Sequence, residues 1–257
     1  MKKPVVGIVG LGLIGGSLAR ALTRKGYRVL GLDREAVNRR ARAARAAATT
    51  TSSLARLAQE AEVIVLAATP KANLALLRRL AGLVRPGAVL TDVGSVKGPI
   101  CREAARLGLS SFVGGHPVAG NEGSGFAASS PDLFRGRSWI LCPGQVGPAA
   151  LRVVESLVRA AGARPVRLDP AEHDRALAFL SHAPQLVSWA VFEAARRDPV
   201  TRRHLDLAGP GFRDMTRLAR SPRRLWREIL AQNQPEVQRA LASVAARLTW
   251  RRGRGGA

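Results

Sequence analysis

The chain has few of the residues that build disulfide frameworks, metal sites or membrane spans. Of its 257 residues two are cysteines, Cys101 and Cys142, and their spacing matches neither a disulfide framework nor a metal-binding motif. No uninterrupted apolar stretch is long enough to cross a bilayer. We therefore expect no metal, no membrane association, and two cysteines that pack as small buried apolar residues.

Acidic and aromatic residues are also scarce. Against 41 Lys and Arg the chain has 18 Asp and Glu, which gives a net charge of +23, and aromatic residues make up 4%. Such a charge suits a polyanion, but the arginines are scattered and few aromatic side chains lie among them to stack on bases. We expect no specific nucleic-acid partner and interpret the charge as general arginine richness combined with an anionic substrate. The basic tail from Arg251 to Arg254 adds at most weak binding to polyanions.

The N-terminus favours a cytoplasmic protein. Lys2 and Lys3 precede an apolar stretch, as in a secretory signal. The five glycines between Gly7 and Gly16, however, fit a phosphate-binding turn better than the apolar helix of a signal.

That glycine-rich turn follows the first apolar run, Val5 to Val9, and leads into a helical pattern. In such a turn the first glycine permits the bend, the second lets the backbone approach a pyrophosphate, and the third lets helix and strand pack closely. The phosphates then lie at the helix N-terminus. The cofactor contacts predicted here are Gly10, Gly12, Leu13, Ile14 and Gly15.

Asp33 ends the second β-rich run, roughly 20 residues beyond the glycines, where an acidic side chain accepts hydrogen bonds from the adenosine ribose. This position favours NAD, although a solvated turn residue would look the same. Arg34 follows and could instead bind the 2′-phosphate of NADP. Thr69 and Pro70 follow the strand predicted at 63–67 and are expected in the same crevice.

Strand-like and helical segments alternate through the first two thirds of the chain. Strands are predicted at 63–67, 88–92, 112–114, 138–141 and 163–168, and helices at 73–83 and 147–161. This α/β pattern predicts a Rossmann-type doubly wound sheet of parallel strands, with its ligand at their carboxyl ends.

After Leu168 the pattern becomes helical, over 170–197, 201–207 and 222–249. We therefore expect an NAD(P)-binding domain at 1–168 and an all-helical substrate and dimerisation domain at 169–257. The helices carry apolar faces that one small domain does not cover, which predicts a homodimer.

His116 is the strongest catalytic candidate. It lies in the Gly/Pro-rich segment Phe112 to Gly125, on a turn predicted to overhang the nicotinamide end of the crevice. There a near-neutral base can accept a carbinol proton as hydride leaves the carbon. A structural turn histidine is the alternative.

The other three histidines differ in context. His182 stands beside Ser181 and Pro184 in an otherwise apolar helix, which fits either a polar cavity or a hydrogen-bonded core histidine. His173 and His204 have charged or polar neighbours and are predicted at the surface.

Two further segments are polar enough to serve a site. Ser95 and Lys97 follow a strand and are predicted to place a hydroxyl and an ammonium at the mouth of the crevice, although Ser95 could simply be a helix N-cap. Arg213 and Arg217, four residues apart on a glycine-flanked turn, are typical of a carboxylate clamp, with a solvated face as the alternative.

Together these segments resemble the prephenate/arogenate (cyclohexadienyl) dehydrogenase family. The matching elements, in order, are Gly10–Ser17, Asp92–Lys97, Gly114–Gly120, Ser181–Pro184 and Gly211–Arg217. The resemblance implies an NAD(P)-binding domain, a helical dimerisation domain, and NAD-dependent oxidative decarboxylation of prephenate to 4-hydroxyphenylpyruvate in tyrosine biosynthesis. Arogenate or broad cyclohexadienyl dehydrogenation is the alternative within the family.

The resemblance also implies roles for single residues. They are His116 as catalytic base, Ser95 as the link between substrate hydroxyl and nicotinamide, His182 and Arg217 at the substrate, Glu122 at the site entrance, and Trp226 beside the substrate. Three positions depart from the common pattern: Gln185 replaces a histidine, Arg213 a lysine and Asn121 a threonine. These departures leave the choice between a keto-acid and an amino-acid side chain open.

Two other kinds of protein share some of these features. A β-hydroxyacid or 6-phosphogluconate-type dehydrogenase shares the Rossmann half and a helical second domain, but the segment around His116 argues against it. The second is a non-catalytic Rossmann protein that binds nucleotides or nucleic acid. It is disfavoured because the chain has all four candidate site residues, Ser95, His116, His182 and Arg217.

Overall fold

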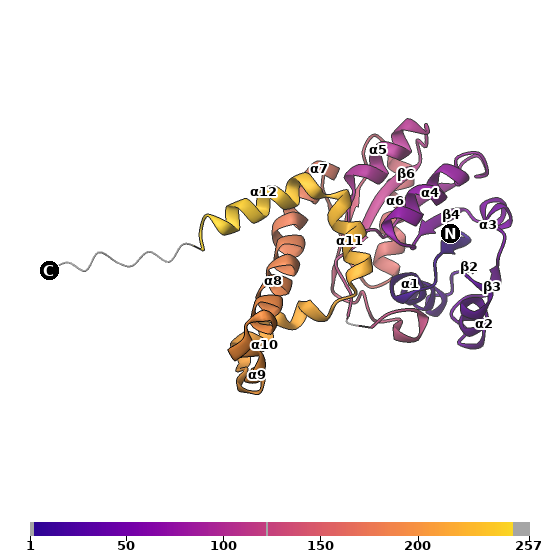
Figure 1. Ribbon diagram of the computed structural model, residues 1–257. Helices are drawn as coiled ribbons and strands as arrows, with labels where there is room; N and C mark the ends of the chain where they lie inside the picture. Colours follow the sequence, from indigo (N-terminus) through magenta and orange to yellow (C-terminus); the bar gives the residue numbers. More distant parts are fainter. Residues whose placement is uncertain (1–2, 122, 249–257) are drawn as a thin grey trace. The chain divides into compact units, whose positions relative to one another are not determined.

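The computed structural model describes residues 3–121 and 123–248 and divides the chain into two compact units, Met1–His173 and Asp174–Ala257. The first unit contains an eight-stranded sheet flanked by helices, and the described part of the second is helical (Figure 1). No helix in the described ranges is long and apolar enough to cross a membrane.

The sheet has the strand order β3-β2-β1-β4-β5-β6-β7-β8. Its strands are β1 (Val6–Val9), β2 (Val29–Leu32), β3 (Thr49–Thr51), β4 (Val63–Leu66), β5 (Val89–Asp92), β6 (Phe112–Pro117), β7 (Ser138–Cys142) and β8 (Arg164–Arg167). The chain winds outward in both directions from the β1–β4 neighbours, so the carboxyl ends of these two strands flank the topological switch point. The predicted Rossmann-type doubly wound sheet is confirmed.

The prediction of parallel strands is wrong at one pair, because β7 runs antiparallel to β6. The described connection between these strands contains only the short 3-10 helix η1 (Phe126–Ala128). A parallel return needs a crossover, usually a full α-helix. The connection over 118–137 is long enough for a crossover, but its described part contains no α-helix, and the chain returns in the opposite direction.

Six helices cover the two faces of the sheet. On one face lie α1 (Leu13–Arg24), α2 (Glu35–Ala43) and α6 (Pro148–Ala160), and on the other α3 (Leu54–Glu60), α4 (Pro70–Leu80) and α5 (Gly98–Arg106). Alternate residues of β4 serve the two cores: Val63 and Val65 pack into the first, and Ile64 and Leu66 into the second. A strand that is buried on both faces consists of consecutive apolar residues, and this pattern predicted β4 from the sequence.

The second unit is built from helices of different lengths. They are α7 (Pro170–Leu177, which begins in the first unit), the π-helix η2 (Ala178–His182), α8 (Ala183–Arg197), α9 (Pro199–Arg203), η3 (Leu205–Leu207), α10 (Pro210–Thr216), η4 (Arg217–Arg220), α11 (Arg223–Gln232) and α12 (Gln234–Ala245). Its core cluster is small and centres on Ala178, Ala183, Val237 and Ala240. Several large apolar side chains are exposed, among them Leu180, Val200, Leu207, Met215 and Leu225.

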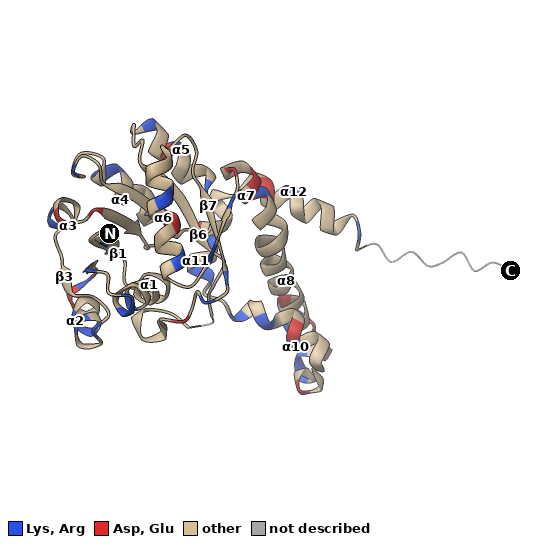
Figure 2. Ribbon diagram, turned by 180° about the vertical axis from the view of Figure 1, so that it is seen from behind, with Lys and Arg blue, Asp and Glu red and all other residues tan. Residues whose placement is uncertain are grey.

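Several local predictions need correction. The segment after Gly209, predicted as a turn, is the helix α10, and the helix predicted over 222–249 is two helices that meet at Asn233. Cys142 is buried as predicted, whereas Cys101 is partly exposed. Lysine and arginine occur on helices along the whole described chain rather than on one element (Figure 2). The basic tail at 251–254 lies outside the described residues.

Candidate active site

The turn after β1 can be made only with glycine. Gly10 has φ of +98°, and a Cβ placed on it would lie 2.6 Å from the carbonyl oxygen of Ala67. A Cβ on Gly15 would lie 1.9 Å from the carbonyl oxygen of Gly10, so this glycine lets α1 approach the turn. Gly12, the N-cap of α1, has no atom within 4 Å of its Cβ position. The backbone is thus packed on one side and open at Gly12, as a phosphate cradle requires.

Asp33 is tied to this turn. Its carboxylate accepts the backbone N–H of Leu11 at 2.7 Å and that of Arg34 at 2.7 Å. The Arg34 side chain itself is 90% exposed. A fixed carboxylate therefore stands beside the glycine turn at the end of β2, where a ribose hydroxyl would bind.

The ends of β4 and β5 border the switch point on its other side. Thr69 is the exposed N-cap of α4, its hydroxyl makes no capping bond, and Pro70 is the first residue of that helix. Ser95 is half-buried in the turn after β5. Helix α5 begins at Gly98 with Lys97 as its N-cap, so the alternative of Ser95 as an ordinary N-cap is wrong.

Lys97 does not present its ammonium at the mouth of a crevice, and that prediction is wrong. Its side chain is fully buried, pairs with the carboxylate of Asp92, and donates to the carbonyl oxygen of Gly115 at 2.8 Å. The other oxygen of Asp92 accepts the N–H of Gly115 at 2.9 Å. A lysine this deep in the protein requires a paired carboxylate. The ion pair thus ties the end of β5 to Gly115 on β6, the residue immediately before His116.

His116 lies within β6 rather than on the predicted turn after it. It is 9% exposed, and its Nδ1 lies 2.8 Å from Nε2 of His173. The two ring centroids are 5.1 Å apart with an interplanar angle of 65°. The glycines before it let the strand continue: a Cβ on Gly115 would lie 2.4 Å from the carbonyl oxygen of Asp92.

The prediction that His173 is at the surface is also wrong, because it is fully buried. It lies on α7, where Leu177 is buried on the same face and Glu172 and Arg175 are exposed. The charged neighbours suggested exposure, but the spacing of four residues between His173 and Leu177 was the usable signal. His204, in contrast, is exposed as predicted.

The second unit holds His182 in a polar setting of its own. His182 ends the π-helix and is 1% exposed, and its Nδ1 lies 3.1 Å from Nδ2 of Asn233. The same Nδ2 donates to the carbonyl oxygen of Asp174 at 2.7 Å, which fixes that atom as the amide nitrogen. Nδ1 of His182 therefore accepts, and in the neutral ring Nε2 carries the proton and is a donor.

Pro184 explains the unusual turn. In an α-helix its ring would clash with the carbonyl of Leu180, and it has no N–H to donate. The wider π-turn at Ala178–His182 relieves this conflict, and Pro184 then lies in the first turn of α8. Turns of this kind occur frequently at functional sites.

Aromatic and amide groups surround His182 within this unit. The ring of Trp226 is 6.1 Å from that of His182, edge to face, and 6.4 Å from that of Trp189. Gln185 is fully buried, and its Nε2 donates to the carbonyl oxygen of Leu218 at 2.7 Å. Its Oε1 is buried and has no hydrogen-bond partner within the described chain.

Arg213 and Arg217 are exposed residues of consecutive helical turns, in α10 and η4. The four-residue spacing places them on the same side of the helix, as a clamp requires. Glu122 lies outside the described residues. Asn121, just before it, accepts the N–H of Gly123 at 2.9 Å with its side-chain oxygen.

The structure thus arranges the predicted residues in two groups. The first unit carries the glycine turn, Asp33, Arg34, Thr69, Pro70, Ser95 and His116, and the second carries His182, Gln185, Arg213, Arg217 and Trp226. Sequence reasoning missed Asp92, His173 and Asn233 as partners of these side chains. Across residues 3–121 and 123–248, no group of three or more His, Cys, Asp or Glu could hold a metal ion.

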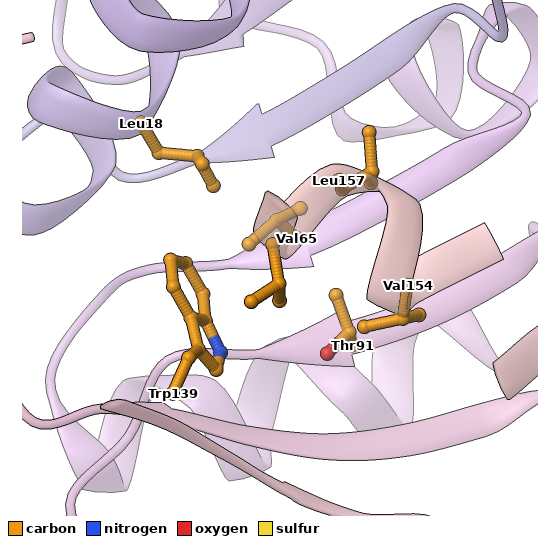
Figure 3. Close-up of a pocket in the computed structure, with 7 residues that line it drawn as sticks. Leu18, Val65, Thr91, Trp139, Val154 and Leu157 are labelled. Atoms are coloured by element: carbon orange, nitrogen blue, oxygen red, sulfur yellow. The ribbon is translucent and has the colours of Figure 1, made fainter. Parts of the chain in front are cut away.

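A small internal cavity lies among core side chains of the first unit, between the sheet and helices α1 and α6 (Figure 3). The atoms that line it are apolar, although two of the lining residues, Thr91 and Trp139, carry buried polar groups that have no hydrogen-bond partner in the described chain. Its walls carry neither a charged group nor one of the predicted site residues, so we assign it to core packing.

Comparisons with known proteins agree with this assembly of elements. The family model for the prephenate dehydrogenase nucleotide-binding domain matches residues 18–167, and the model for the prephenate dehydrogenase dimerization domain matches 169–250. A prephenate dehydrogenase of Lactococcus lactis is 32% identical over 240 residues. The alignment covers 90% of this chain, and the chain spans 65% of that relative's length.

Two solved structures are similar across nearly the whole chain. One is an arogenate dehydrogenase from Synechocystis, with a TM-score of 0.83, 32% identity, and coverage of 95% of this chain and 89% of that one. The other is a prephenate dehydrogenase from A. aeolicus in complex with hydroxyphenyl propionate and NAD+, with a TM-score of 0.89, 28% identity, and coverage of 96% and 89%. The chain therefore belongs to the prephenate dehydrogenase family.

Proposed function

We propose that this protein is an NAD-dependent prephenate dehydrogenase, which converts prephenate to 4-hydroxyphenylpyruvate and carbon dioxide in tyrosine biosynthesis. The observation that carries the proposal is His116, a nearly buried imidazole on β6 whose Nδ1 is engaged by His173. A near-neutral base held in this way suits removal of a hydroxyl proton.

The turn after β1 fits the nucleotide. Gly12 offers open backbone at the N-terminus of α1, while Gly10 and Gly15 are closed against neighbouring backbone. Asp33 supplies the ribose acceptor, and the exposed Arg34 leaves NADP as the alternative cofactor. Leu13, Ile14, Thr69 and Pro70 would border the bound nucleotide. NAD, when bound, supplies the acceptor for the hydride of the substrate's carbinol carbon.

The chain's own residues position the substrate and move one proton. His116 accepts the proton of the ring hydroxyl, and Ser95 bonds to the same hydroxyl. Loss of the ring carboxylate as carbon dioxide leaves its electron pair in the ring, which becomes aromatic. Because aromatisation drives the reaction, the protein contributes mainly orientation and charge.

Anion binding is assigned to the second unit. In its Nε2–H form His182 donates to a carboxylate, and the guanidinium of Arg217, with Arg213 four residues before it, binds a second one. Trp226 offers an aromatic edge near His182. Glu122 stays a prediction for the site entrance. The positive charge of the chain favours approach of a dianion.

A homodimer is part of the proposal. The second unit has a small core and exposes large apolar side chains, including Leu180 and Leu207 at 77% and 76%. A second copy that covers such residues removes apolar area from water. The cytoplasmic location stays a prediction.

Arogenate is the second candidate substrate, and Gln185 favours it. With its Nε2 bound to Leu218, its Oε1 is a buried acceptor that lacks a donor in the described chain. Arogenate carries an ammonium where prephenate carries a keto group, and an ammonium donates to an amide oxygen.

The deciding experiment follows NAD reduction by absorbance with prephenate and with arogenate, each repeated with NADP. Turnover with prephenate and NAD is the expected result, and turnover with arogenate alone would reassign the substrate. Loss of turnover in His116→Asn, with unchanged NAD affinity, identifies the base. If neither substrate reduces NAD or NADP, the proposal is overturned and a non-catalytic nucleotide-binding protein is favoured.

A further inference from the structure

The contact between His116 and His173 restricts the protonation of both rings. Nδ1 of His116 and Nε2 of His173 are 2.8 Å apart, and both rings are buried or nearly so. At that distance one nitrogen donates and the other accepts. Two neutral arrangements are therefore possible, and they have opposite consequences for the far nitrogen of His116.

In the first arrangement His116 carries its proton on Nδ1 and donates it to His173. Nε2 of His116 then has a lone pair and can accept a substrate proton. In the second, His173 donates from Nε2, and the neutral His116 must carry its proton on its own Nε2. That nitrogen is then unable to act as a base.

We propose that His173 is the positioning residue of the catalytic base, and that it holds His116 in the Nδ1–H form by accepting that proton at its own Nε2. This inference rests on the proposed function, in which His116 removes the hydroxyl proton. After proton transfer His116 is an imidazolium, and its Nδ1–H still donates to His173. The same bond thus serves the ring before and after the step, as the carboxylate partner of a catalytic histidine does in serine proteases.

The surroundings support a fixed ring rather than a mobile one. His116 follows Gly115, whose N–H and carbonyl are both bound by the buried Asp92–Lys97 pair. His173 is fully buried on α7, and its backbone N–H donates to the carbonyl of Asp169 at 2.9 Å. Backbone anchors therefore hold both partners of the contact, and the 2.8 Å bond between the two rings adds a side-chain restraint on the orientation of each imidazole.

Two variants of His173 separate this role from simple packing. Glutamine can place its Oε1 near the position of the histidine Nε2 and still accept a proton, whereas leucine fills space but cannot accept. We expect His173→Leu to lower kcat for prephenate roughly 10- to 100-fold, a part of what a general base contributes, with the KM for NAD within about twofold. His173→Gln should restore most of the lost kcat.

The control is His204→Leu, a change of the same residue types at an exposed site, which should leave both parameters unchanged. Circular dichroism and thermal unfolding of each variant check that the fold is retained. Equal losses of kcat in the leucine and glutamine variants, or no loss in either, would overturn the proposal.

A second measurement examines the wild-type protein directly. Nitrogen NMR of ¹⁵N-histidine-labelled protein distinguishes protonated from unprotonated ring nitrogens, with His116→Asn used to assign the signals. We expect His116 to be protonated at Nδ1 and unprotonated at Nε2 in the neutral enzyme. A proton on Nε2 contradicts the proposal. If the wild-type protein turns over neither substrate, the proposed function fails, while the spectrum still decides which way the hydrogen bond runs.

Discussion

Asp92 and Lys97 form a buried ion pair at the end of β5, and both side chains bind the backbone of Gly115. The regular pairing of β5 with β6 ends two residues earlier, at Thr91 and Val113. Beyond that point, bonds from the side chains of Asp92 and Lys97 to Gly115 hold β6 beside β5, directly before His116. We infer that the pair supports the strand that carries His116, the proposed base.

Lys97→Met should destabilise the protein strongly. It leaves the carboxylate of Asp92 buried without its cation, which typically costs about 3–5 kcal/mol. Chemical unfolding measures the loss, and the exposed Lys25→Met should change the free energy of unfolding by less than about 0.5 kcal/mol. If Lys97→Met has wild-type stability and only a raised KM for prephenate, Lys97 is a substrate-binding residue and the structural role is wrong.

Arg217→Ala should chiefly raise the KM for the substrate. Loss of one charge-assisted hydrogen bond to a carboxylate costs about 1.5–3 kcal/mol, which corresponds to a roughly 10- to 150-fold change in affinity. Initial rates at saturating NAD measure it. Arg220→Ala, in the same short helix, is the matched control and should behave as wild type. A fall in kcat at constant KM would argue against a clamp.

Asn233→Ala should weaken substrate binding through His182. The amide nitrogen of Asn233 donates to Nδ1 of His182, and its loss removes a bond that favours the proton on Nε2. We expect the KM for prephenate to rise roughly tenfold, comparable with one hydrogen bond to a charged group. Gln238→Ala on the exposed side of α12 is the control. Unchanged kinetics in Asn233→Ala would show that the position of the ring proton of His182 does not affect substrate binding.

Glu103 should contribute to acid sensitivity. Hydrogen bonds from Arg106 and Arg78 lower the pKa of its carboxyl from 4.5 to about 2. Since the folded state holds the charged form more strongly than the unfolded state, this contribution is complete above about pH 4.5 and is lost as the pH falls towards 2.

Thermal unfolding between these pH values tests that contribution. Glu103→Gln should flatten the decline in melting temperature, and Arg78→Gln should flatten it in part. An identical acid profile in the wild type and Glu103→Gln would assign the decline to other carboxyls.

The sequence predicted the structure best at positions that only one residue type, or one kind of residue, can occupy. Gly10 and Gly15 occupy positions that no side chain could fill, and β4 is apolar because both of its faces are buried. The three threonines of β3 carry no such pattern, and this edge strand was not predicted.

Contacts between particular side chains could not be predicted in the same way. Lys97 looked like a cleft cation because its carboxylate partner lies five residues away across a turn, and His173 looked exposed because its neighbours along the chain are charged. His116 was expected on a turn because glycine and proline surround it, yet the close approach of Gly115 to Asp92 keeps it in the strand. In each case the deciding contact is set by tertiary structure.

The π-turn before Pro184 also fixes the rotational phase of α8. In an α-helix each residue advances the side chain by about 100°. The turn at Ala178–His182 inserts one extra residue into the spiral, so everything after it is rotated by about that angle relative to an uninterrupted helix. Deletion of a single residue there would return the spiral to its ordinary pitch and rotate Gln185 and Trp189 away from the carbonyls of Leu218 and Ala219. The side of α8 that carries these groups is thus determined by one added residue, which lies between Ala178 and His182.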